Sequence, residues 1–225
     1  MSDKTAKLDE IIRLEWDMFQ AVNEGGPRAA CQNDKATFDI MRRAQFAAWP
    51  EDIRLSYLDD LRSAKLAGRN LVKEKYIQMM KFTMPAAYKN LQSMITPPTK
   101  AAKQLAQDIC GKLVVQNAEL DTLYPYLSGK GRPLYATGDR QDVTSFETYQ
   151  LGELLTYSEK TLVLLNGYIE QREQAGNGSL AYDILSNTVR YYGYDTLEAA
   201  ETVIKEQSAS KRGESTLGCS CGADK

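Results

Sequence analysis

The sequence predicts one all-α domain followed by a flexible C-terminal tail. Apolar residues recur at three-to-four spacing along most of the chain, which is the period of an amphipathic helix, whereas the alternating runs that mark strands are almost missing. The 225 residues are 43% hydrophobic and 26% charged, an ordinary globular composition. We therefore expect a bundle of eight or nine helices over residues 1–207 and a tail over 208–225.

Five helices are expected in the first half of the chain, each with a cap or a breaker at its ends. The first carries the apolar residues of segment 8–22 and stops before Gly25-Gly26-Pro27, which no helix would cross. The next four are expected from the Asn33-Asp34 cap to Trp49, from Pro50 to Gly68, from Asn70 onward, and from Pro85 to Pro97-Pro98.

The second half of the chain is predicted to contain the longest helix. It begins at Thr144-x-x-Glu147, which has the pattern of a capping box, and reaches about Ala175. A sixth helix is expected from Thr99 to Tyr124-Pro125, followed by a Gly-, Arg- and Lys-rich loop over 128–140. Two further helices are expected to start at Ser179 and at Asp195-x-x-Glu198. A tail of disordered composition is expected from residue 208.

The chain contains no histidine, and this absence excludes more chemistry than any other count. Histidine is the usual general base near neutral pH and the commonest metal ligand. Triads with histidine, zinc sites with histidine ligands, histidine-ligated haem and Glu-x-x-His di-iron centres are therefore excluded. With 28 basic against 30 acidic residues, the chain also lacks the basic surface that nucleic-acid binding requires.

Targeting signals are missing from the sequence. Residues 1–10 include no apolar h-region, and no segment approaches the roughly 20 apolar residues that cross a bilayer. We therefore expect a cytoplasmic protein with no membrane partner, in which the four cysteines stay reduced. The sequence indicates neither a cofactor nor an oligomeric state.

Glu15 stands in the middle of the apolar face of the first helix. An unpaired carboxylate there would cost several kcal/mol, so we expect it to be paired, protonated or facing a cavity. Arg42 and Gln45 lie on the apolar face of the second helix, and the guanidinium of Arg42 suits a carboxylate, either that of Glu15 or that of a ligand. Two interpretations stay open: a buried pair that fixes the helix crossing, or a polar pocket between the helices.

Phenols and carboxylates gather on the other predicted helices. Tyr76 lies on the apolar face of the fourth helix, Glu153 and Tyr157 are four residues apart on the longest one, and Tyr192 belongs to a later run of phenols. Lys75 is interpreted as a solvated charge. These side chains either edge the core or line a cavity. In the second case the candidate catalytic groups are Glu15, Tyr76, Glu153 and Tyr157, and the candidate ligand-binding groups are Arg42, Gln45 and Tyr192.

Cys219 and Cys221 offer a different chemistry near the C-terminus. Two thiols at this spacing can bind a soft metal or close into a strained, oxidising disulfide. They leave a tetrahedral metal half-liganded, and Cys31 and Cys110 could help only if the tail folds back. The loop at 128–133 has the glycine and positive charge of phosphate-binding loops but not their spacing.

Short motifs spread along the chain resemble a known family. They include Glu15-Trp16-Asp17-Met18-Phe19, Cys31-Gln32-Asn33-Asp34, Gly68-Arg69-Asn70-Leu71, Glu74-Lys75-Tyr76 and Tyr192-Gly193-Tyr194. The family is an uncharacterised bacterial helical one that carries a domain-of-unknown-function label, and the resemblance covers nearly the whole folded region. It implies a single bacterial cytoplasmic domain and transfers no mechanism.

The expected function is binding of a small polar or anionic metabolite in an interhelical pocket. Its lining would be Glu15, Arg42, Gln45, Tyr76, Glu153 and Tyr157. If the site is catalytic, carboxylates or phenols whose pKa values are raised by burial would carry lyase, isomerase or hydrolase chemistry. The alternative is a thiol-redox or soft-metal protein acting through Cys219 and Cys221. A third possibility, a helical interaction module, would be favoured by a dry, packed centre around Glu15 and Arg42.

Overall fold

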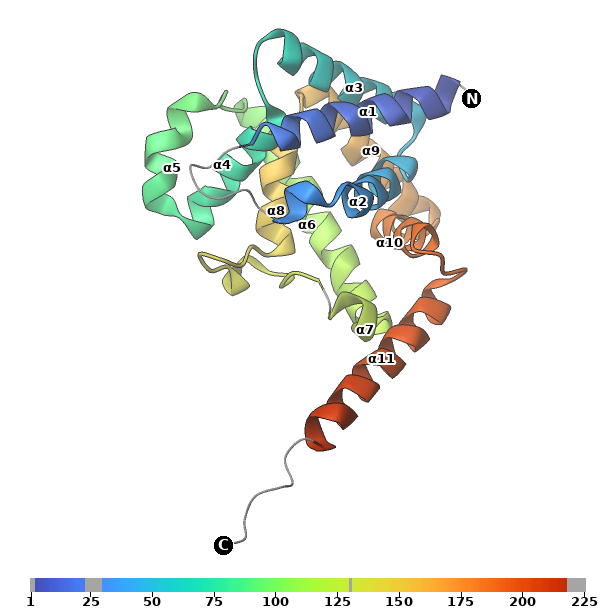
Figure 1. Ribbon diagram of the computed structural model, residues 1–225. Coiled ribbons are helices and arrows are strands. Elements are labelled where there is room, and N and C mark those ends of the chain that lie inside the picture. The colour runs from blue at the N-terminus through green and yellow to red at the C-terminus, as the bar shows by residue number, and fades with distance from the viewer. Residues whose placement is uncertain (1–2, 23–29, 130, 218–225) are drawn as a thin grey trace, which may run out of the picture.

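The computed structural model describes residues 3–22, 30–129 and 131–217, with side chains over 5–210 of these ranges. This part of the chain contains eleven α-helices and three 3₁₀ helices and no strand. The α-helices are α1 (Asp3–Gln20), α2 (Lys35–Ala47), α3 (Glu51–Leu66), α4 (Leu71–Thr83), α5 (Pro85–Leu91), α6 (Lys100–Leu123), α7 (Pro125–Ser128), α8 (Phe146–Leu154), α9 (Glu159–Ala175), α10 (Leu180–Tyr191) and α11 (Leu197–Leu217) (Figure 1). The 3₁₀ helices are η1 (Ala30–Asn33), η2 (Gln92–Met94) and η3 (Ala136–Gly138).

The all-α prediction is confirmed, but the predicted number of eight or nine helices is wrong. The long helix expected over 144–175 is two helices, α8 and α9, because the chain turns between them. The Ser158 side chain caps α9 by accepting a hydrogen bond from the Thr161 amide at 3.2 Å. Pro125 starts the additional short helix α7, where a missing N–H costs nothing.

The C-terminal part also differs from the expectation. The predicted boundary at residue 208 falls inside α11, which continues to Leu217. Cys219 and Cys221 lie outside the described residues. None of the described helices combines the length and the apolar composition that a bilayer crossing needs.

Four of the eleven described α-helices begin at the side-chain cap that the sequence predicts. Four caps accept a hydrogen bond from the amide three residues on at 2.9–3.1 Å, namely Asp34, Asn70, Thr99 and Ser179. Two other starts are shifted by one residue, because Ser145 rather than Thr144 caps α8, and Thr196 rather than Asp195 bonds the first turn of α11. The carboxylate of Asp139 accepts from the Ser145 amide at 2.6 Å and so holds this residue in the capping position.

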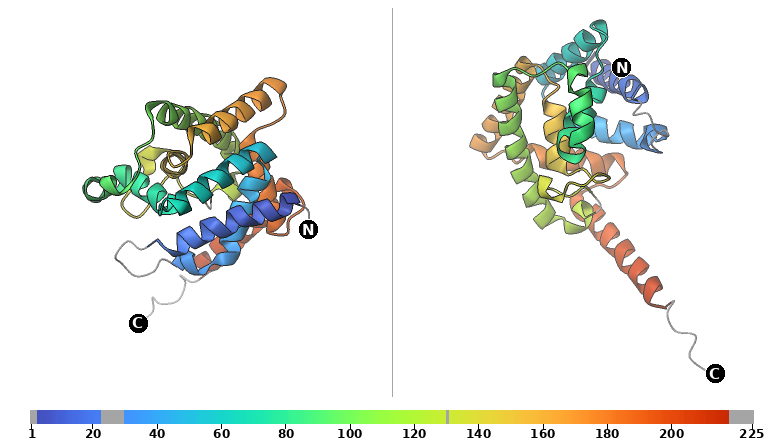
Figure 2. Two further views of the ribbon diagram at one scale, coloured as in Figure 1. Left: turned by 90° about the horizontal axis from the view of Figure 1, so that it is seen from above. Right: turned by 90° about the vertical axis from the view of Figure 1, so that its left-hand side faces the viewer.

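Helix α8 lies at the centre of the bundle, with α4 on one side and α6 on the other (Figures 1 and 2). Helix α1 packs against α2, α3 and α4, while α9 packs against α3 and α6 and α10 packs against α2 and α6. The largest fully buried side chains include Phe46, Ile53, Leu58, Leu61, Ile109, Leu154, Leu162 and Leu165. The helices that pack around α8 therefore contribute apolar side chains to one main core.

Helix α11 leaves the body and points away from it (Figure 1). Its first turns pack in a small cluster with Val189, in which Leu197 and Ala200 are buried. The Glu201 carboxylate accepts hydrogen bonds from the amides of Tyr126 and Leu127 at 2.9 and 2.8 Å. These bonds join α11 to the first turn of α7, where a negative charge is favourable.

Gly152 lets α8 approach α4 closely. A Cβ atom at this position would lie 2.8 Å from the Met79 Cγ atom and 3.1 Å from the Lys75 carbonyl oxygen, both on α4. The second contact is with backbone, which cannot move without shifting the whole helix. Glycine weakens the interior of a helix, so its presence in α8 is explained by this contact rather than by local preference.

We predict that Gly152→Ala destabilises the protein by about 1–3 kcal/mol, because the added methyl group separates two packed helices. Gly111→Ala is the matched control, since Gly111 also lies inside a helix and its Cβ would meet nothing within 4 Å. The control should gain about 0.5–1 kcal/mol from helix propensity alone. Urea unfolding monitored by circular dichroism measures both changes, and a stabilised Gly152→Ala would contradict the close-approach argument.

Candidate functional site

Four charged side chains meet in the interior of the bundle. Glu15 comes from α1, Arg42 from α2, Lys75 from α4 and Glu153 from α8, and none is more than 8% exposed. We call this group, together with the polar side chains bonded to it, the buried network. The two carboxylates and the two cations have opposite charges of equal number, so the net charge of these four side chains is zero.

Arg42 is the centre of the buried network. Its Nε and Nη2 atoms donate to the two oxygens of Glu15 at 2.6 Å each, a bidentate contact. Its Nη1 and Nη2 atoms donate to the two oxygens of Glu153 at 3.2 and 3.0 Å, and Nη1 also donates to Gln45 Oε1 at 2.8 Å. A guanidinium has five N–H groups, and the protein itself supplies an acceptor for each.

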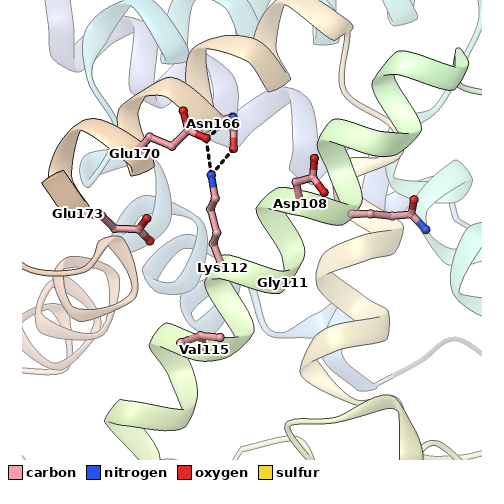
Figure 3. A pocket seen from close by; sticks show the side chains of 8 residues that line it. Asp108, Gly111, Lys112, Val115, Asn166, Glu170 and Glu173 are labelled. Carbon is pink, nitrogen blue, oxygen red and sulfur yellow. Dashed lines mark hydrogen bonds and ion pairs between the residues drawn. The ribbon is translucent and has the colours of Figure 1, made fainter.

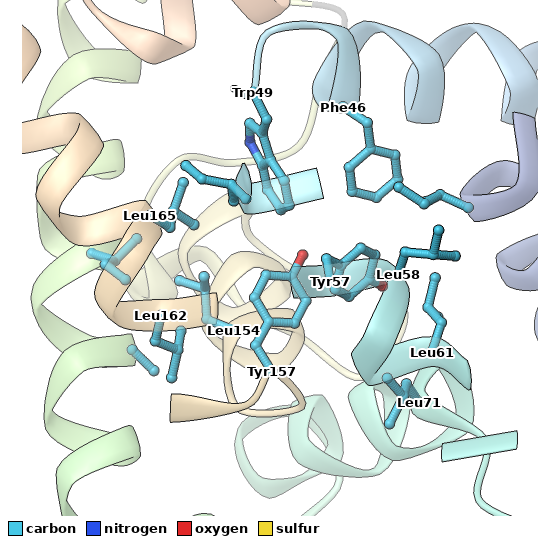
Figure 4. Close-up of a cluster of buried hydrophobic side chains, with 14 of the residues drawn as sticks. Phe46, Trp49, Tyr57, Leu58, Leu61, Leu71, Leu154, Tyr157, Leu162 and Leu165 are labelled. Atoms are coloured by element: carbon cyan, nitrogen blue, oxygen red, sulfur yellow. The ribbon is translucent and has the colours of Figure 1, made fainter. Parts of the chain in front are cut away.

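Two buried phenols complete the bonding of the carboxylates. Tyr57 donates to Glu15 Oε1 at 2.6 Å, and Tyr157 donates to Glu153 Oε1 at 2.7 Å. Burial raises the pKa of both phenols well above the ordinary value, and the neighbouring carboxylates raise it further. Both tyrosines therefore stay neutral donors. Their rings lie next to each other beneath Trp49 in the aromatic part of the core (Figure 4), with centroids 4.7 Å apart.

Lys75 connects the buried carboxylate of Glu153 to Tyr149, which is half-buried and lies nearer the surface. The ammonium donates to Glu153 Oε2 at 3.1 Å and to the Tyr149 hydroxyl at 2.7 Å. Burial alone would lower the pKa of Lys75, but Tyr149 and Glu153 outweigh burial, so that the pKa is raised. Burial would likewise raise the pKa of Glu153, whereas Arg42 and Lys75 together hold it below its usual range. Lys75 and Glu153 are therefore both charged at neutral pH.

The structure joins five of the sequence-predicted residues by hydrogen bonds, whereas Tyr76 and Tyr192 are not part of this set. Those that meet are Glu15, Arg42, Gln45, Glu153 and Tyr157. Tyr76 instead stacks on Phe19, with ring centroids 6.4 Å apart, and Tyr192 is an exposed residue at the end of α10. Neither forms a hydrogen bond with the buried network in the described part of the chain.

Sequence reasoning missed Tyr57, Lys75 and Tyr149. Lys75 was interpreted as a solvated charge, and this is wrong, because only 7% of it is exposed. The inward face of α4 includes Glu74, Lys75 and Gln78, so polar residues occupy positions where the apolar period indicates solvent. The Glu74-Lys75 pair inside an otherwise apolar segment was the available signal.

The outer end of the buried network is formed by two cations and two phenols. The Lys75 Nζ atom lies 4.1 Å from the ring centroid of Tyr149 and 5.7 Å from that of Tyr76. The guanidinium carbon of Arg132, which is exposed, lies 4.7 Å from the Tyr149 ring centroid. Here, in contrast to the interior, positive charge reaches the surface.

A family model matches residues 6–202. The chain belongs to the family described as protein of unknown function (DUF4125). This confirms the resemblance read from the short motifs. No curated protein and no solved structure matches the chain.

Two hollows in the described part of this DUF4125 protein lie away from the buried network. One, of about 650 Å³, runs between α6 and α9 (Figure 3). Its lysine, Lys112, already donates to Asn166 and Glu170 at 2.9 and 2.6 Å. A second, of about 500 Å³, lies between the α2–α3 corner and α10. No residue of the buried network lines either hollow, so neither hollow is the interhelical pocket around Arg42 that the sequence predicts.

Metal chemistry finds little support among the described residues. In these ranges no three cysteine, aspartate or glutamate side chains are placed to hold one ion. Cys31 is exposed, and Cys110 is buried with its pKa raised to about 12 by burial, so its thiol stays protonated.

We predict that Arg42→Met destabilises this DUF4125 protein by about 3–5 kcal/mol, because Glu153 then keeps Lys75 as its cation, whereas Glu15 keeps only the neutral Tyr57 hydroxyl. The double variant Glu15→Gln/Arg42→Met restores the balance of charge and should unfold at higher urea concentration than the single variant. Arg62→Met, which removes a solvent-exposed partner of Glu10, should leave stability almost unchanged. A double variant less stable than Arg42→Met would contradict the charge-balance account.

We predict that stability falls as the pH is lowered below the ordinary glutamate pKa of 4.5. The pKa of Glu153 is depressed in the folded protein, so the unfolded chain takes up this proton first and acid favours unfolding. The free energy of unfolding measured in urea at about pH 6 and about pH 3 gives the slope. Glu153→Gln should flatten the slope, and an unchanged slope would show that other carboxylates carry it.

Proposed function

We propose that the protein binds a small anionic metabolite at the outer end of the buried network, where Lys75, Arg132, Tyr76 and Tyr149 lie. In this proposal Tyr149 is the group that exchanges a proton with the bound molecule. The metabolite site expected from the sequence thus moves from Arg42, whose donors are all used, to the adjacent cation. The buried network then acts as the support of the site rather than as the site itself.

The observation that carries the proposal is the incomplete bonding of Lys75 and Tyr149. An ammonium has three N–H groups, and Lys75 uses two of them, on Glu153 and on Tyr149. The Tyr149 hydroxyl accepts the bond from Lys75, but its own proton has no acceptor within the described ranges. Buried and half-buried polar groups are normally paired, so an acceptor supplied by a ligand would complete both.

The charge at this end favours an anion. Inside, the two carboxylates already balance Arg42 and Lys75. Arg132 adds a positive charge that no described carboxylate neutralises, and its one protein hydrogen bond is to the Thr144 carbonyl at 3.2 Å. A guanidinium with free donors suits a carboxylate or a phosphate group.

The two phenols differ in what they can do. Burial raises the pKa of Tyr76 to about 12, which keeps it a neutral donor. Tyr149 has Lys75 Nζ on its hydroxyl oxygen at 2.7 Å, so the negative charge left by a departing proton would be stabilised at once. The Lys75 contact therefore makes Tyr149 the phenol that we assign the proton-exchange role, and this role would serve the lyase, isomerase or hydrolase chemistry expected from the sequence.

We predict that Arg132→Gln weakens binding of citrate and inorganic phosphate, the two probes, about tenfold, the loss expected for one charge-assisted contact. The matched control is Arg140→Gln, since Arg140 is exposed on the same connection between α7 and α8. Isothermal titration calorimetry measures both variants against the unaltered protein. Equal effects of the two substitutions, or no binding of either probe to the unaltered protein, would refute the anion site at this end.

A further inference from the structure

The hollow between the α2–α3 corner and α10 contains a buried donor that the protein does not use. Trp49 lines this hollow and is only 4% exposed, yet its indole N–H has no acceptor within the described ranges. Among the described residues, every fully enclosed side-chain N or O atom has a hydrogen-bond partner. The indole N–H is therefore not fully enclosed, and the space next to it is the hollow. In Figure 4 the indole nitrogen lies on the side of the ring that faces away from Phe46.

One face of α10 places further donors in the same hollow. Ser186 and Arg190 are one helical turn apart, and both line it. Neither the Ser186 hydroxyl nor the Arg190 guanidinium forms a hydrogen bond or an ion pair in the part of the chain that the structure describes. Three kinds of donor, an indole N–H, a hydroxyl and a guanidinium, thus line one hollow, and none of them has an acceptor among the described residues.

The remaining polar groups of the hollow do not offset this positive charge. Asp183 forms an ion pair with Arg172, Nη2 to Oδ2 at 2.8 Å, so its charge is neutralised. The side-chain nitrogen of Asn187 donates a hydrogen bond to the Ala44 carbonyl oxygen at 3.2 Å. The unpaired charge of the hollow is that of Arg190, and an anion is the ligand that such a set of donors fits.

Aromatic rings form the walls. Tyr168 is held by Arg172, whose Nη1 atom donates to the phenol oxygen at 2.9 Å, and Tyr182 contributes a second ring from α10. Ala47 and Pro50 add apolar surface from the corner. The hollow has a volume of about 500 Å³, within the range of small-molecule sites, and it is open to solvent with a lining that is more polar than apolar.

We propose that this hollow is a binding site for a small aromatic carboxylate. Its carboxylate accepts hydrogen bonds from Trp49 Nε1, Arg190 and Ser186, and its flat apolar body lies beside Tyr168 and Tyr182. This site is separate from the outer end of the buried network, and the proposal does not depend on the function proposed there. The α6–α9 hollow is a weaker candidate for an anion, because its lysine is already bonded and three carboxylates, Asp108, Glu170 and Glu173, also line it (Figure 3).

The experiment is a titration of the full chain with benzoate, followed by the indole N–H signals in two-dimensional ¹H–¹⁵N NMR. The protein has two tryptophans, and Trp16→Phe assigns the signal of Trp49. Benzoate should shift the Trp49 signal in a saturable manner and leave the Trp16 signal in place. Benzyl alcohol, which keeps the ring and lacks the charge, should cause no saturable shift of the Trp49 signal.

Arg190→Gln should raise the dissociation constant for benzoate about tenfold, while Arg13→Gln, an exposed arginine on α1, should leave it unchanged. Arg190 is exposed on α10, so its replacement is not expected to affect folding, and an unchanged amide spectrum would verify this. The proposal is overturned if benzoate leaves the Trp49 signal unmoved, if benzyl alcohol shifts it equally, or if both arginine variants bind benzoate alike.

Discussion

The bidentate contact between Arg42 and Glu15 is the interaction on which the rest of the structure depends. It joins α1 to α2, and the other edge of the same guanidinium joins both to α8 through Glu153. Lys75 then attaches α4 to the same carboxylate. Buried ion pairs add little to stability relative to apolar packing, but an arrangement that separated these charges would leave one of them unpaired in the core. The network therefore selects one helix arrangement among those that would bury similar apolar area.

Packing around the network makes these contacts possible. Gly152 brings α8 against α4 at the turn that carries Lys75, so the Glu153 carboxylate can reach its ammonium. The ring of Tyr57 stacks on Phe46 and contacts the tilted ring of Tyr157, and the hydroxyls of the two tyrosines donate hydrogen bonds to the buried carboxylates in place of water. In a chain without histidine, neutral phenols supply the hydrogen bonds that an imidazole would give elsewhere.

Local signals in the sequence predict the helices well, but only part of the network. Glu15 and Arg42 interrupt apolar faces, and an interruption of this kind is visible in one helix at a time. The burial of Lys75 depends on Glu153 and Tyr149, which are distant in sequence, and the apolar period of α4 alone places Tyr76 inward instead. The turn between α8 and α9 was missed for a related reason. Tyr157 sits four residues after Glu153, as in a helix, and contacts it, although the helix has already ended.

The complete bonding of Arg42 bears on where the two proposed ligands would bind. The Arg42 guanidinium, with five protein acceptors, has no donor left for a ligand, whereas the indole N–H of the buried Trp49 meets no acceptor among the residues that the structure describes. The ring packs on Tyr57 and Tyr157 with centroids 5.9 and 6.1 Å apart, and both phenols are bonded to network carboxylates. The network thus holds the Trp49 ring, and with it the direction of the N–H, in the absence of any ligand. A donor fixed in this way loses little conformational entropy on binding, which is the condition under which a small ligand gains affinity from few contacts.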